Sequence, residues 1–135
     1  MVRLYHYTDA GSLRAIKKSK TIDRSTEDPH GQSRDMHYGP GVYLTSMDPA
    51  EHTEEELAEN NWQGGARARM TSGKLDHYVW IDIEDSDRWL EKCWTRSKRD
   101  VWLYKRTINL ERFDWGSDSN SNWSALQVKL DRVSA

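Results

Sequence analysis

The sequence has little cysteine, little net charge and no long apolar run. Its single cysteine, Cys93, excludes an internal disulfide. A net charge of -2 and a pI of about 6.2 disfavour a surface that attracts nucleic acid or an anionic membrane. No apolar stretch approaches the ~20 residues of a membrane-spanning helix, and the N-terminal region lacks a signal-like segment. We therefore expect a soluble, cytoplasmic chain without membrane contact.

Metal-binding side chains are also few and poorly spaced. His30, His37 and His52 lack the i, i+4 spacing or the cysteine partners of a zinc site, so no metal is expected. No local arrangement supports Cys93 as a nucleophile, and we expect a buried thiol instead.

The chain is nevertheless long enough to fold. Its 135 residues match the length of one domain, so we expect residues 1–135 to form a single, monomeric unit. Only 36% of the residues are hydrophobic and the mean hydropathy is -0.97. Seven tryptophans and six tyrosines offset this polarity, since each buried aromatic side chain removes about 150–250 Å² from water. The composition therefore predicts a core of a few large side chains.

The apolar pattern predicts an α+β domain with a mixed, largely antiparallel sheet. Leu13 and Ile16 recur on one face of a helix that Asp9 can cap. Strict alternation over His77–Ile83 is typical of a half-buried strand. The expected strands are residues 2–7, 21–22, 41–45, 77–83, 100–104, 107–110 and 124–133, and the expected helices are residues 10–19, 48–61 and 86–93.

Polar stretches separate these elements. Residues 23–40 form an expected loop that is longer than most compact domains tolerate without a functional reason. A second loop is expected over residues 63–73 and a polar turn over residues 116–122. Asp48 and Pro49 are expected to open the helix 48–61, since a cap followed by proline suits the first turn.

Three short strings carry the residues with chemical potential. They are Leu4–Thr8, Gly39–Thr45 and Arg99–Tyr104. In this order they resemble the three motifs of the ADP-ribosyltransferases of the diphtheria-toxin and poly(ADP-ribose) polymerase branch. The closest variety carries aspartate rather than glutamate in the third motif. The resemblance implies a split, mostly antiparallel sheet with two or three short helices, and NAD as the substrate.

The resemblance also implies a role for each motif. It places His6 on the ribose next to adenine, the backbone of Tyr7 on the nicotinamide carboxamide, and the Thr8 hydroxyl beside them. Tyr43 would pack on the nicotinamide, where a ring facing a pyridinium contributes roughly 0.5–2 kcal/mol. Asp100 would bond the 2′-hydroxyl of the nicotinamide-side ribose and stabilise a developing cation.

The glycines of the second motif are implied to let the backbone approach NAD, since neither Gly39 nor Gly41 carries a Cβ. Thr45 closes the same motif. The implied catalytic residues are His6, Tyr43 and Asp100, and the implied NAD-binding residues are His6, Tyr7, Thr8, Gly39, Gly41, Tyr43 and Thr45.

Two residues depart from the pattern of the family. Tyr7 stands where the polymerases carry glycine, and Asp100 stands where most of the transferases carry glutamate. The shorter carboxylate reaches an acceptor less well. This disfavours elongation of an ADP-ribose chain and favours a single transfer or hydrolysis of NAD.

The leading hypothesis is a toxin-like mono-ADP-ribosyltransferase that cleaves the nicotinamide–ribose bond of NAD through an oxocarbenium-like centre. It would pass ADP-ribose to a macromolecular acceptor, which we expect to be a protein rather than a nucleic acid. One alternative is an NAD glycohydrolase that uses water. Another is a non-catalytic module that binds NAD, ADP-ribose or a partner protein. Transfer of an RNA 2′-phosphate is disfavoured by the net charge of -2.

Overall fold

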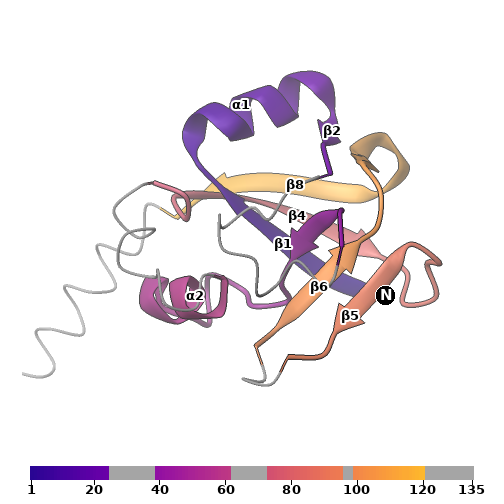
Figure 1. The fold of residues 1–135 in the computed structure, drawn as a ribbon. Coiled ribbons are helices and arrows are strands. Elements are labelled where there is room, and N and C mark those ends of the chain that lie inside the picture. Colours follow the sequence, from indigo (N-terminus) through magenta and orange to yellow (C-terminus); the bar gives the residue numbers. More distant parts are fainter. Residues whose placement is uncertain (25–38, 62–72, 96–98, 121–135) are drawn as a thin grey trace, which may run out of the picture.

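The computed structural model describes residues 1–24, 39–61, 73–95 and 99–120. Within these ranges the chain forms two α-helices and short, antiparallel β-strands (Figure 1). The predicted α+β class is therefore confirmed. The expected strand 124–133 and most of the two expected loops lie outside the described residues.

A first sheet has the strand order β1-β4-β8. Its strands are β1 (Val2–Thr8), β4 (His77–Ile83) and β8 (Asp114–Ser119). β1 and β4 pair with Leu4 opposite Ile81. The alternation predicted for β4 is confirmed, because every second side chain of this strand is fully buried.

A second sheet has the order β3-β6-β5. Its strands are β3 (Val42–Leu44), β6 (Val101–Tyr104) and β5 (Leu90–Cys93). An isolated bridge joins this sheet to β1: Tyr5 N–H donates to the Thr45 carbonyl at 2.7 Å, and Thr45 N–H donates to the Tyr5 carbonyl at 3.1 Å. The two sheets therefore form one split sheet, as the resemblance implies.

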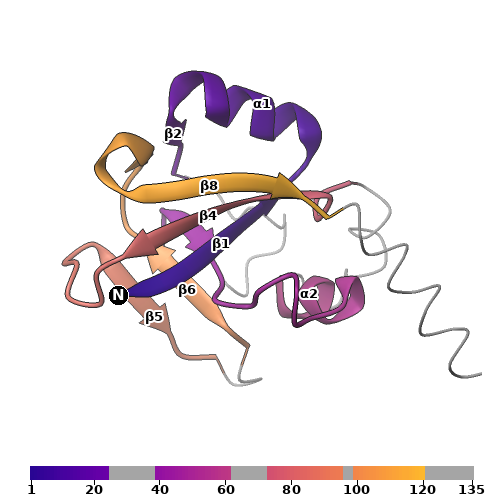
Figure 2. The same cartoon turned by 180° about the vertical axis from the view of Figure 1, so that it is seen from behind.

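Helix α1 (Ala10–Ser19) lies over one face of the first sheet (Figures 1 and 2). The Asp9 carboxylate caps it as predicted, accepting the Ser12 N–H at 2.7 Å, and the helix ends at Lys20 in the left-handed region. The pair β2 (Thr21–Ile22) and β7 (Ile108–Asn109) follows at its end, and the 3₁₀ helix η2 (Leu110–Arg112) replaces the last residue of the expected strand 107–110.

The core beneath α1 draws on both sheets and is mainly aliphatic. The composition suggested a few large side chains, but the described tryptophans are partly buried against core residues, except for Trp94, which is exposed. The buried cluster consists of Leu4, Leu13, Ile16, Ile22, Val42, Leu44, Val79, Ile81, Ile83, Tyr104, Ile108 and Leu110.

Helix α2 (Glu54–Asn61) packs on the opposite face of β1, where Leu57 and Ala58 contact the buried ring of Tyr5. The expected opening at Asp48 is wrong. Thr53 Oγ1 accepts the Glu56 N–H and Glu56 Oε1 accepts the Thr53 N–H, both at 3.1 Å, and this reciprocal capping box starts the helix five residues later.

The expected helix 86–93 is also wrong. Residues 90–93 pair with β6 as strand β5, with Leu90 opposite Tyr104. Asp87 accepts the Trp89 N–H at 2.9 Å and closes a turn before the strand.

Most of the expected turn 116–122 is strand β8 instead. Gly116 lies opposite Trp80, and a Cβ at this glycine would lie 2.5 Å from the indole Nε1. The small residue therefore makes room for a large ring across the ladder. Within the described residues, no helix is long and apolar enough to cross a membrane.

Candidate active site

The three motifs meet where β1 and β3 separate. The first motif lies in β1, the second leads into β3, and Asp100 directly precedes β6. Past the bridge from Tyr5 to Thr45, the His6 side chain reaches the β3 backbone, with Nδ1 3.3 Å from the Tyr43 carbonyl oxygen. The fold therefore brings His6 and Tyr43 together.

His6 is partly buried and has one ring nitrogen committed to the protein. A carbonyl oxygen only accepts hydrogen bonds, so the contact with Tyr43 requires the proton on Nδ1. Burial lowers the pKa of His6 below its ordinary value, which favours the neutral ring near pH 7. Nε2 is then an acceptor, suited to a hydroxyl donor such as a ribose.

The phenol of Tyr43 is tied to its own loop. Its hydroxyl donates to the Gly39 carbonyl at 2.6 Å, and Gly39 has a φ of +88°, which favours glycine. Gly41 is needed for a different reason: a Cβ there would lie 2.5 Å from both Leu103 Cδ1 and the Tyr104 carbonyl oxygen. Gly41 thus permits close packing of the second motif on β6.

Ser46 holds the carboxylate of Asp100. Its backbone N–H donates to Asp100 Oδ1 at 3.0 Å, and its hydroxyl donates to Oδ2. Both oxygens of the carboxylate are therefore bonded from the residue that follows the second motif. Charge-assisted bonds of this kind are stronger than neutral ones and fix the orientation of a carboxylate.

Asn60 of α2 holds the main chain of the same aspartate. Asn60 Oδ1 accepts the Asp100 N–H at 2.6 Å, and Nδ2 donates to the Asp100 carbonyl at 2.9 Å. Asn60 Nδ2 also lies 3.3 Å from Thr45 Oγ1. The hydroxyl of Thr45 is consequently part of the protein's own network.

The side chains of Tyr7 and Thr8, the other two candidate residues of the first motif, point to opposite faces of β1. Tyr7 points to the α2 side of β1, where its hydroxyl donates to the Met47 carbonyl at 2.7 Å. Burial raises the pKa of this phenol, so it stays protonated. Only the backbone of Tyr7 can therefore contact a ligand on the face of β1 that carries the His6 side chain. Thr8 is buried two residues after His6, on the same face of the strand.

Sequence reasoning missed Ser46 and Asn60. Ser46 directly follows the second motif, so its position beside the site could have been noticed. Asn60 lies three residues after the buried Leu57, on the apolar face of α2, and is itself 7% exposed. An asparagine on such a face was the available signal, because a buried amide must find partners.

Two other expectations concern residues away from the motifs. Cys93 is buried, as predicted. His30 and His37 lie outside the described residues, and in the described part of the chain no three His, Cys, Asp or Glu side chains are grouped to hold a metal ion.

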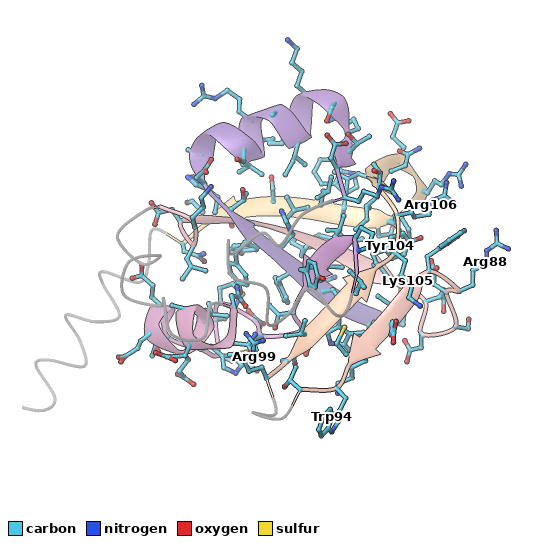
Figure 3. All side chains as sticks on the ribbon, in the orientation of Figure 1. Arg88, Trp94, Arg99, Tyr104, Lys105 and Arg106 are labelled. Atoms are coloured by element: carbon cyan, nitrogen blue, oxygen red, sulfur yellow. The ribbon has the colours of Figure 1, made fainter. Side chains whose placement is uncertain are left out.

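Arg99, the residue before Asp100, also contacts α2. Arg99 Nη1 donates to the Asn60 carbonyl at 3.0 Å, and Figure 3 shows the Arg99 side chain beside α2 while Trp94 points outward. Trp94 is 77% exposed. Trp94 directly follows β5, and Arg99 is the first residue of the third motif.

Comparison with known protein families gives one match. Residues 4–111 match the model of a toxin family described as "HYD1 signature containing ADP-ribosyltransferase". The matched segment includes all three motifs and covers most of the chain. No curated protein and no solved structure matches the sequence. The chain therefore belongs to this family of ADP-ribosyltransferase toxin domains and is a transferase.

Proposed function

We propose that the chain is a mono-ADP-ribosyltransferase that uses NAD and passes ADP-ribose to a macromolecular acceptor, a protein being favoured. The observation that carries the proposal is the Asp100 carboxylate, held by Ser46 next to the motif that contains Tyr43. ADP-ribosyltransferases use NAD as their substrate, and the family match over residues 4–111 supports this choice.

Each side chain has a task in this proposal. The acceptor nitrogen of His6 binds a hydroxyl of the adenine-side ribose, and the ring of Tyr43 packs on the nicotinamide. Asp100 bonds the 2′-hydroxyl of the other ribose and stabilises the positive charge that develops as the nicotinamide leaves.

Hydrolysis of NAD is the second candidate. Both carboxylate oxygens of Asp100 accept bonds from Ser46, and an aspartate is one methylene shorter than a glutamate. A carboxylate held close to its strand can orient a ribose without reaching far toward a large acceptor. The same site would then transfer ADP-ribose to water.

The test is nicotinamide release from NAD by the purified protein, first without an acceptor and then with cell lysate. We expect His6→Ala, Tyr43→Ala and Asp100→Asn to lower the rate by about 100-fold or more, as losses of groups that act on the transition state do. Asp118→Asn, on the exposed part of β8, is the matched control and should keep the rate.

The outcomes separate the candidates. If a lysate protein is labelled by the unmodified enzyme and not by Asp100→Asn, the result supports transfer. Release of nicotinamide without an acceptor supports hydrolysis. If NAD raises the melting temperature but no nicotinamide is released, the chain is a module that binds NAD without turning it over. Absence of both turnover and stabilisation would contradict the proposed function.

A further inference from the structure

The most informative group outside the three motifs is the carboxamide of Asn60. It is almost completely buried, on the face of α2 that packs against β1. A buried amide is costly unless its donors and acceptor are used. All of its polar atoms are used here, and the partners include both main-chain groups of one residue, Asp100.

This carboxamide forms the hydrogen bonds to Asp100 that a neighbouring strand would otherwise form. β3 ends at Leu44 and β6 begins at Val101, so Asp100 lies just beyond the ladder that joins them. A side-chain amide presents one acceptor and one donor in a plane, as a peptide group does. Asn60 offers that pair to the N–H and C=O of Asp100, at 2.6 and 2.9 Å.

The same helix is anchored to the rest of the site. Leu57 and Ala58 are fully buried against the rings of Tyr5 and Tyr7, which flank His6 in β1. Asn60 Nδ2 reaches Thr45 Oγ1, the residue that bridges β1 and β3. Helix α2 is therefore connected to all three motifs.

We propose that Asn60 is a positioning residue for the transfer reaction: by holding the main chain of Asp100 in a fixed place relative to β1 and β3, it aims the carboxylate that Ser46 orients. This inference rests on the proposed function, because it assigns Asp100 the role of the reacting carboxylate. A displacement of about 1 Å at such a group can lower a rate by about 100-fold.

The first test compares kcat and KM for NAD in nicotinamide release. Asn60→Ala should lower kcat by about 10-fold to 100-fold and change KM by less than about three-fold, since the NAD contacts assigned to His6 and Tyr43 remain. Glu59→Gly, at an exposed position of the same helix, is the matched control. It weakens the same helix by removing helix propensity while leaving the carboxamide, so it should lower the melting temperature and keep kcat.

The second test uses Asn60→Asp, which keeps the shape of the side chain. When its carboxyl is protonated, it can still donate to the Asp100 carbonyl and accept the Asp100 N–H. When it is ionised, the donor is lost. Burial raises the pKa of such a carboxyl. The ratio of the Asn60→Asp rate to the unmodified rate should therefore fall as pH rises through about 5 to 8, whereas the ratio for Asn60→Ala should stay flat.

Hydrogen exchange distinguishes the ways in which the inference can fail. Asn60→Ala should accelerate exchange of the Asp100 amide more than that of Val101. A kcat of Asn60→Ala within about two-fold of the unmodified protein, or a loss equalled by Glu59→Gly, would overturn the inference alone. An unmodified protein that releases no nicotinamide, yet shows a protected Asp100 amide, would overturn the proposed function and the catalytic part of the inference with it.

Discussion

At the scale of single residues, the side chains of the candidate site are held in place by hydrogen bonds within the protein. His6 gives one ring nitrogen to the Tyr43 carbonyl, and the Tyr43 hydroxyl bonds Gly39. Ser46 and Asn60 hold the carboxylate and the main chain of Asp100. Little reorganisation is then needed when a ligand enters, which is the physical basis of electrostatic preorganisation.

The buried ring of His6 predicts a pH dependence of stability. Burial lowers its pKa below 6.5, so in the range below about pH 6.5 the unfolded chain binds a proton that the folded chain does not. The free energy of unfolding should therefore decrease as pH falls from about 7 to 5. Urea denaturation across this range should show the decrease, and His6→Gln should make it shallower.

The effect of His6 can be separated from the effects of His52 and Asp9. His52→Gln removes a histidine outside the motifs and should leave more of the slope in place than His6→Gln does. Bonds from Ser12 N–H and Lys74 lower the pKa of Asp9 to about 2, so its contribution is lost only below about pH 4. A slope that is identical in the unmodified protein and in His6→Gln would contradict the prediction.

At the scale of elements, the correct sequence predictions concern local bonds. The cap of α1 joins Asp9 to Ser12, and the alternation over His77–Ile83 depends on one strand having a buried face. Both signals are contained in a few neighbouring residues. The family resemblance supplied the split sheet, which no short pattern predicts.

The wrong element predictions have non-local causes. Leu90–Cys93 is a strand because it pairs with β6, although a helix was expected over residues 86–93. Gly116 lies in a strand because β8 pairs with β4, and the indole of Trp80, 36 residues away in the sequence, occupies the space that a side chain at Gly116 would take. The bond between Asn60 and Asp100 spans 40 residues and leaves no periodic signal. Tertiary contacts therefore overrode local propensity at these places.

The start of α2 provides a test at this scale. Thr53→Ala removes a hydroxyl that accepts the Glu56 N–H, and should lower the free energy of unfolding by about 1 kcal/mol. Thr53→Ser keeps the hydroxyl and should cost less. Urea denaturation followed by far-ultraviolet circular dichroism measures both. If Asp48→Ala lowers the free energy of unfolding more than Thr53→Ala does, Asp48 is the cap of this helix, as the sequence suggested.

At the scale of the whole molecule, one core stabilises both sheets. Leu44 of the second sheet and Leu4 of the first belong to the same buried cluster beneath α1, whereas the backbone link between the sheets is an isolated bridge. Side-chain packing, more than hydrogen bonding between strands, therefore keeps the two halves of the split sheet together.

Truncation of this core should affect both sheets. Leu44→Ala removes a side chain that is 4% exposed and should cost about 2–5 kcal/mol of unfolding free energy. Hydrogen exchange should show a similar loss of protection for slowly exchanging amides of β4 and β6, because the halves unfold together. Loss confined to β6, with β4 unchanged, would show that the sheets are independent units.

During synthesis, neither sheet can be completed early. Along the described chain β1 belongs to the first sheet, β3 to the second, β4 to the first, β5 and β6 to the second, and β8 to the first again. A growing polypeptide thus contains His6 and Tyr43 before the segment that presents Asp100 has left the ribosome. At about 5–20 residues per second, this delay lasts several seconds. The three motifs can therefore come together only after this last segment has been made.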